Sequence, residues 1–91
     1  MFVIISYDIV DDKRRNKISK MLEDYGIRVQ YSVFECLIEK EQLKDIKELA
    51  EEIINPAEDS IRYYIICEEC LRKIEIMGIG EVTTDLDFYI V

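Results

Sequence analysis

The chain has 91 residues, of which 49% are hydrophobic and 35% are charged, and 20 acidic residues against 12 basic ones give it a formal net charge of −8. This length predicts one small globular domain, and the charge excludes a protein whose whole surface binds nucleic acid, because phosphate contacts need a basic face. Histidine is absent, so carboxylates must perform any acid–base or metal chemistry. The segment MFVIISYD lacks a basic region and a cleavage site, and no run of about 18 apolar residues follows, so we expect a cytoplasmic protein without a membrane span.

The N-terminal third predicts a strand followed by an amphipathic helix. Residues 2–9 (FVIISYDI) are β-branched and aromatic, which is typical of a strand. Asp11 or Asp12 can then accept backbone N–H bonds at the start of a helix. The apolar stripe of this helix has the spacing i, i+3, i+4, i+7 and consists of Ile18, Met21, Leu22 and Tyr25. Gly26 is expected to end the helix.

The rest of the chain repeats the alternation of strands and helices. Residues 28–38 predict a long second strand or, with a bend, two strands. Residues 41–54 predict the second helix and residues 60–67 a further strand. Residues 73–76 are a candidate short strand, and residues 86–91 (LDFYIV) predict a final strand.

This order fits a single α+β domain over residues 1–91, a ferredoxin-like βαββαβ sandwich with two helices on one face of an antiparallel sheet. Both faces of the expected sheet are nevertheless apolar. In the first strand one face carries Val3, Ile5 and Tyr7, and the other carries Phe2, Ile4, Ser6 and Asp8. Because two helices cover only one face, we predict a homodimer that packs sheet against sheet or exchanges a strand, with residues 86–91 as the extra strand at the dimer interface.

Asp8 is the candidate metal ligand. It ends the first strand on the face of Ser6, which is the expected dimer side. A two-fold axis near this strand end would bring two Asp8 carboxylates together, and a divalent cation such as Mg²⁺ would relieve their repulsion. The alternative is that Asp8 is an ordinary strand-end residue that bonds the backbone of the next loop.

A basic cluster follows at once, formed by Lys13, Arg14, Arg15, Lys17 and Lys20. Helical spacing directs Arg14 and Arg15 towards the strand end of Asp8 and the three lysines outward, and Arg28 extends the patch. Arginine forks suit phosphate oxygens, and a metal carboxylate beside them suits phosphodiester chemistry. The alternative is a solvated helix face. In that alternative Arg14 or Arg15 pairs with one of three acids, Asp8, Asp11 or Asp12.

Two further sets of residues allow more than one interpretation. The aromatic residues Tyr7, Tyr31, Phe34, Tyr63 and Tyr64 either stack on bases or pack in the core and the interface. The three cysteines are Cys36, Cys67 and Cys70, and this odd number does not suggest a disulfide framework. Cys67 and Cys70 form one C-x-x-C, for which incidental thiols, a local disulfide and a metal shared between two chains all stay open.

Taken together, these segments resemble the CRISPR-associated Cas-two family over nearly the whole chain. The resemblance rests on Ser6-Tyr7-Asp8, Asp12-Lys13-Arg14-Arg15-Asn16-Lys17, Tyr25-Gly26, Val29-Gln30-Tyr31-Ser32-Val33-Phe34-Glu35, Asp59-Ser60-Ile61-Arg62-Tyr63-Tyr64 and Cys67-x-x-Cys70. No single segment would be specific alone.

The resemblance implies a ferredoxin-like homodimer with Asp8 as catalytic metal ligand, Mg²⁺ or another divalent cation as cofactor, and endonuclease activity on RNA or DNA. It also implies a complex with the Cas-one integrase during spacer acquisition in antiviral defence. The alternative is a non-catalytic scaffold that binds nucleic acid and bridges integrase dimers. The implied nucleic-acid contacts are Arg14, Arg15, Lys17 and Arg28. Tyr7, Ser32 and Phe34 are implied as supporting neighbours.

Overall fold

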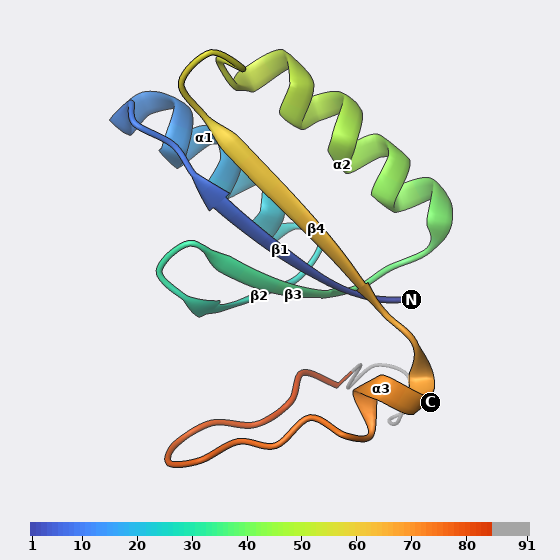
Figure 1. The fold of residues 1–91 in the computed structure, drawn as a ribbon. Coiled ribbons are helices and arrows are strands. Elements are labelled where there is room, and N and C mark those ends of the chain that lie inside the picture. Colours follow the sequence, from blue (N-terminus) through green and yellow to red (C-terminus); the bar gives the residue numbers. More distant parts are fainter. Residues whose placement is uncertain (85–91) are drawn as a thin grey trace.

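The computed structural model describes residues 1–84 and confirms the expected α+β plan (Figure 1). The elements are β1 (Phe2–Asp8), α1 (Asp12–Glu23), β2 (Ile27–Gln30), β3 (Val33–Leu37), α2 (Lys40–Ile53), β4 (Ser60–Ile66) and the short α3 (Glu68–Leu71). The expected final strand at 86–91 lies outside the described residues. No helix in the described part is long and apolar enough to cross a membrane.

The four strands form one sheet in the order β2-β3-β1-β4, and every neighbouring pair is antiparallel. The segment predicted as one long strand, or as two with a bend, forms two strands, β2 and β3, because the chain turns at Tyr31 and Ser32. The candidate strand at 73–76 is wrong: α3 and a following turn lead the chain away from the sheet, and no strand within residues 1–84 lies beside this segment (Figure 1).

Helix α1 begins and ends for local reasons. Asp11 is the N-cap, and its carboxylate accepts a hydrogen bond of 3.0 Å from the Arg14 backbone N–H. After the helix, the Gly26 N–H donates to the Leu22 carbonyl at 3.0 Å. Gly26 is needed for space rather than for an unusual backbone conformation, because a Cβ there would lie 2.5 Å from the Glu35 carbonyl oxygen on β3. The helix ends earlier than the sequence predicts, at Glu23 with Asp24 as the C-cap, and the close approach of β3 explains the glycine.

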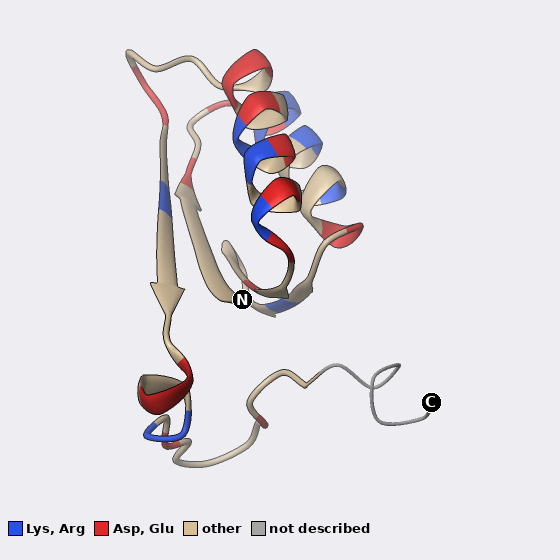
Figure 2. Cartoon of the chain, turned by 90° about the vertical axis from the view of Figure 1, so that its right-hand side faces the viewer, with Lys and Arg blue, Asp and Glu red and all other residues tan. Residues whose placement is uncertain are grey.

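Both long helices cover the same face of the sheet (Figures 1 and 2). The core between them and the sheet is formed by Val3, Ile5, Tyr7, Ile9, Ile18, Leu22, Phe34, Cys36, Ile38, Leu43, Ile46 and Ala50. No helix of the described residues lies over the opposite face, and the strands themselves are mostly uncharged (Figure 2). On that face Thr83 donates to Glu35, so the segment after α3 covers part of it. Ile27 is still 54% exposed and Tyr64 is 45% exposed, so an apolar surface remains open in the described part of the chain.

Candidate functional site

Asp8 lies at the last position of β1 and opposite Ser60 of β4. Strand alternation places it on the sheet face without helices, since Tyr7 points into the core. Its side chain is exposed, and among residues 1–84 it makes no hydrogen bond or ion pair. The described part of one chain brings no group of three or more His, Cys, Asp or Glu side chains together for a metal. Asp8 therefore offers a single carboxylate, and a magnesium ion here would need further oxygen ligands from outside the described residues, such as water.

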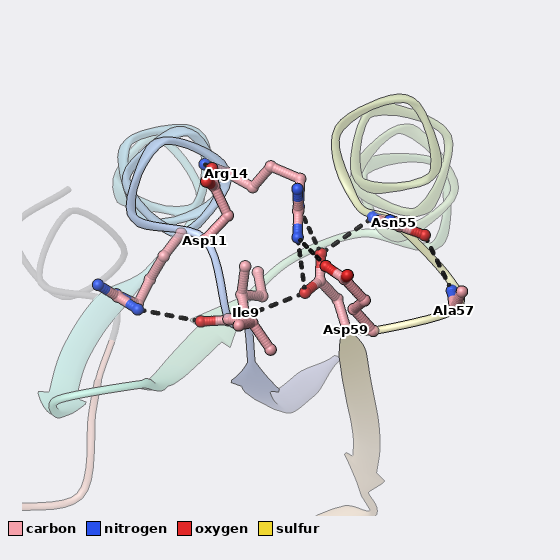
Figure 3. A network of polar contacts seen from close by, with 9 residues as sticks. Ile9, Asp11, Arg14, Asn55, Ala57 and Asp59 are labelled. Atoms are coloured by element: carbon pink, nitrogen blue, oxygen red, sulfur yellow. Dashed lines mark hydrogen bonds and ion pairs between the residues drawn. The ribbon is translucent and has the colours of Figure 1, made fainter.

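The best-connected carboxylate near this strand end belongs to Asp59, which the sequence reasoning missed (Figure 3). Its side chain is 0% exposed. Oδ2 accepts from Arg14 Nε at 2.8 Å and from the Asn55 N–H at 2.9 Å, and Oδ1 accepts from the Val10 N–H at 3.2 Å. These bonds tie the β1–α1 loop to the α2–β4 loop, so they fix the backbone that follows Asp8.

The ion pair at this junction is charged at neutral pH. The hydrogen bond from Arg14, helped by the Asn55 and Val10 N–H groups, lowers the pKa of Asp59 to about 2, although burial acts in the opposite direction. The bond to Asp59 likewise raises the pKa of Arg14. The pair therefore adds no net charge to the strand end.

Arg14 has partners that the sequence did not indicate. Besides Asp59, its Nη2 donates to Glu58 Oε2 at 3.0 Å, and its side chain is 25% exposed. The pairing expected with Asp8, Asp11 or Asp12 does not occur for this side chain; Asp11 accepts only the backbone N–H of Arg14. Arg14 still lies near the end of β1, but its guanidinium is engaged within the fold.

Arg15 follows the alternative interpretation, because it pairs with Asp12. It also donates through Nη1 to the Ile9 carbonyl at 3.0 Å, which places its guanidinium beside the residue that follows Asp8. The structure thus brings Arg15 to the strand end through the backbone of β1 and its loop.

The other expected contacts do not converge on Asp8. Lys17 is exposed on α1. Arg28 donates to the Ser19 hydroxyl and lies 5.5 Å from the centre of the Phe34 ring, on the helix side of the sheet and therefore on the face opposite Asp8. Lys17 and Arg28 remain available to a nucleic acid only as contacts separate from the strand end.

The three supporting residues hold the sheet and the core together. Phe34 is 0% exposed, and the rings of Tyr7 and Phe34 stack with centroids 6.4 Å apart. The Tyr7 N–H donates to the Ser32 carbonyl at 3.1 Å. Tyr7 and Phe34 therefore position the end of β1 by packing and are not exposed for base stacking.

The fold and this strand end define a ferredoxin-like domain with an exposed carboxylate on the uncovered face of its sheet. A family model described as CRISPR associated protein Cas2 matches residues 1–74. The chain belongs to the Cas2 (Cas-two) family.

Individual relatives agree with this assignment. A protein of Chloroflexus aurantiacus named CRISPR-associated endoribonuclease Cas2 3 is 46% identical over 91 residues, which cover 100% of this chain and 98% of that protein. The crystal structure of Streptococcus pyogenes Cas2 at pH 6.5 is 37% identical, covers 86% of this chain and 100% of that one, and has a TM-score of 0.75. A chain of a structure described as a partial Cas6-RT-Cas1–Cas2 complex is 27% identical, covers 93% and 96% of the two chains, and also has a TM-score of 0.75.

Proposed function

We propose that this chain is a cytoplasmic, metal-dependent endonuclease that cleaves phosphodiesters of RNA, or of DNA, and acts with the Cas-one integrase in spacer acquisition. The observation that carries the proposal is the exposed Asp8 carboxylate at the end of β1, on the uncovered face of the sheet. The endoribonuclease name of the Chloroflexus relative, which matches this chain along its full length, supports the same activity.

A homodimer is part of this proposal. The uncovered face carries exposed apolar side chains, including Ile27 and Tyr64, and a second copy of the same face is a matched cover for them. In such a dimer the Asp8 carboxylates of both protomers would hold Mg²⁺ or another divalent cation together with water. The bound cation would supply a more acidic water and would stabilise charge on the phosphate oxygens.

The chain's own residues would prepare the site around that position. The Asp59–Arg14 pair fixes the backbone after Asp8, so that the carboxylate projects from a defined strand end. Arg15 donates to the Ile9 carbonyl close to this strand end, and a phosphate there would compete with the exposed Asp12 for its guanidinium.

The test compares wild type, Asp8→Asn and the control Asp45→Asn, which alters an exposed acid on α2. We expect Mg²⁺-dependent cleavage of single-stranded RNA or duplex DNA to fall roughly 100-fold in Asp8→Asn, since several kcal/mol of charge stabilisation would be lost. Calorimetric Mg²⁺ binding should weaken in parallel, while Asp45→Asn should match wild type. Cleavage by Asp8→Asn at the wild-type rate would rule out the catalytic role of Asp8.

A second candidate function is a non-catalytic scaffold that binds nucleic acid and bridges integrase dimers. It is favoured by the structural neighbour in the Cas1–Cas2 complex. A scaffold would keep its integrase assembly and spacer acquisition after Asp8→Asn. Lys17→Ala should weaken duplex binding and reduce its salt dependence, because Lys17 is exposed whereas Arg14 is bound to Asp59. Binding by Lys17→Ala with unchanged affinity and salt slope would count against a phosphate contact there.

A further inference from the structure

Two thiols lie together at the end of the sheet opposite Asp8. Cys67 follows β4 directly and is the N-cap residue of α3, and Cys70 lies in that short helix. In the antiparallel pairing of β1 with β4, Asp8 faces Ser60 and Phe2 faces Ile66, so the thiols are separated from Asp8 by the length of a strand (Figure 1). They are therefore no part of the proposed metal site.

A backbone hydrogen bond joins Cys70 to the sulfur atom of Cys67. The Cys70 backbone N–H donates to Cys67 Sγ at 3.4 Å. Both residues are exposed. Because the Cys70 side chain starts from the residue whose N–H already touches Cys67 Sγ, rotation about its side-chain bond can bring the two sulfur atoms into bonding range without unwinding the sheet.

The two thiols differ in acidity. The hydrogen bonds from the Cys70 backbone and thiol lower the pKa of Cys67, and the same thiol contact raises the pKa of Cys70. One sulfur is thus suited to carry the negative charge while the other keeps the proton. Burial raises the pKa of the third thiol, Cys36, to about 11, so Cys36 serves as an unreactive internal reference.

We propose that Cys67 and Cys70 are a redox-active dithiol that forms an intramolecular disulfide by exchange with a low-molecular-weight disulfide. The Cys67 thiolate attacks one sulfur of that disulfide, whose S–S bond breaks and releases one thiolate, leaving a mixed disulfide on Cys67. Cys70 then loses its proton to solvent and attacks Cys67 Sγ, which forms the Cys67–Cys70 bond and releases the second thiolate. Two electrons pass from the protein dithiol to the small disulfide, which ends as two thiols.

The disulfide would act on the segment that leaves α3. This segment returns to the sheet, where Thr83 donates to Glu35 Oε1 through its N–H at 3.2 Å and through its hydroxyl at 2.6 Å. A bond between Cys67 and Cys70 would fix the turn that precedes residues 72–84. The oxidation state of the two cysteines would therefore determine the backbone conformation where this segment begins.

The test uses the full-length folded protein with oxidised glutathione at pH 7. After an acid quench, free thiols are alkylated and the intact mass and the modified peptides are measured. Wild type should lose two alkylatable thiols to a Cys67–Cys70 disulfide and carry no lasting glutathione, while Cys36 stays reduced. Cys70→Ser should trap glutathione on Cys67. In Cys67→Ser, Cys70 should react with glutathione disulfide at least about threefold more slowly than Cys67 does in Cys70→Ser, because a thiol that keeps its proton is the poorer attacking group.

Several results would overturn this proposal. A dithiol couple is excluded if wild type retains all its thiols, stops at a stable glutathione adduct, or loses the Cys36 thiol at the same rate as the exposed pair. Reaction that begins only after addition of a chelator would indicate a metal held by the thiols instead. Circular dichroism verifies that the serine variants are folded, and the wild-type peptide map decides the question even if one variant is not.

Discussion

Asp59 is the residue whose replacement tests most directly how the strand end is held. Asp59→Ala removes the acceptor of four hydrogen bonds, two from Arg14 and one each from the Val10 and Asn55 N–H groups. The Val10 and Asn55 N–H groups are part-buried, and leaving each of them unpaired costs about 1 kcal/mol, so together they account for a loss of ~2 kcal/mol. For a domain of this size that corresponds to a fall of roughly 8–16 °C in the thermal midpoint.

The pH dependence of this effect has a defined sign. The pKa of Asp59 is lowered from 3.8 to about 2 in the folded protein, so the bonds that favour its ionised form stabilise the fold above pH 3.8 and are lost as the pH falls to about 2. The difference in thermal midpoint between wild type and Asp59→Ala should therefore be largest near neutral pH and shrink between pH 4 and pH 2.

The assay is thermal unfolding followed by circular dichroism at one protein concentration, because dimerisation would make the midpoint depend on concentration. Asp45→Ala, at an exposed position on α2, is the matched control and should change the unfolding free energy by less than about 0.5 kcal/mol. If Asp59→Ala unfolds at the same midpoint as Asp45→Ala, or if the difference from wild type stays constant down to pH 2, the hydrogen bonds to the Asp59 carboxylate do not stabilise the fold.

Two further predictions concern the packing behind the strand end. Gly26→Ala should lower the free energy of unfolding by about 1–3 kcal/mol, because its Cβ would lie 2.5 Å from the Glu35 carbonyl oxygen; an unchanged urea midpoint would show that β3 can move aside. Phe34→Ala should cost about 3–5 kcal/mol by leaving a cavity. Phe34→Leu should cost under about 1.5 kcal/mol and keep the cleavage rate per folded molecule, whereas a lower rate in folded Phe34→Leu would indicate that the ring contacts the substrate.

The elements that the sequence predicts well are those with a strong local pattern. The apolar run of β1 and the stripe of α1 needed no tertiary information, and Asp11 could be expected as the cap. The turn at Tyr31 and Ser32 gave only a weak signal, because serine favours turns less than glycine, proline, asparagine or aspartate and tyrosine is not a turn residue. The candidate strand at 73–76 had a suitable composition but no neighbouring strand, and pairing cannot be deduced from composition.

The sequence did not indicate the ion pair of Asp59, because this pair depends on a contact between residues far apart in the chain. Asp59 is separated from Arg14 by 45 positions, and it follows a loop that contains Pro56 and Ala57. The one usable signal was its position just before β4, where an acid can face the end of the neighbouring first strand. By contrast, the pairing of Arg15 with Asp12 is local, and helical spacing was sufficient to indicate it.

The arrangement of the arginines changes how charge at this strand end should be understood. The basic cluster that begins at Lys13 suggests that Arg14 and Arg15 form a positive patch near Asp8, yet Arg14 is neutralised by Asp59 and Glu58. Arg14 therefore contributes rigidity, Arg15 is paired with the exposed Asp12, and the exposed lysines are left to attract phosphate. A substitution of Arg14 would disturb folding and binding together, so a loss of nucleic-acid affinity in that variant would not identify a phosphate contact. Exposed positions such as Lys17 separate a loss of binding from a loss of folding. The backbone position of Asp8, in contrast, depends on the ion pair between Arg14 and Asp59.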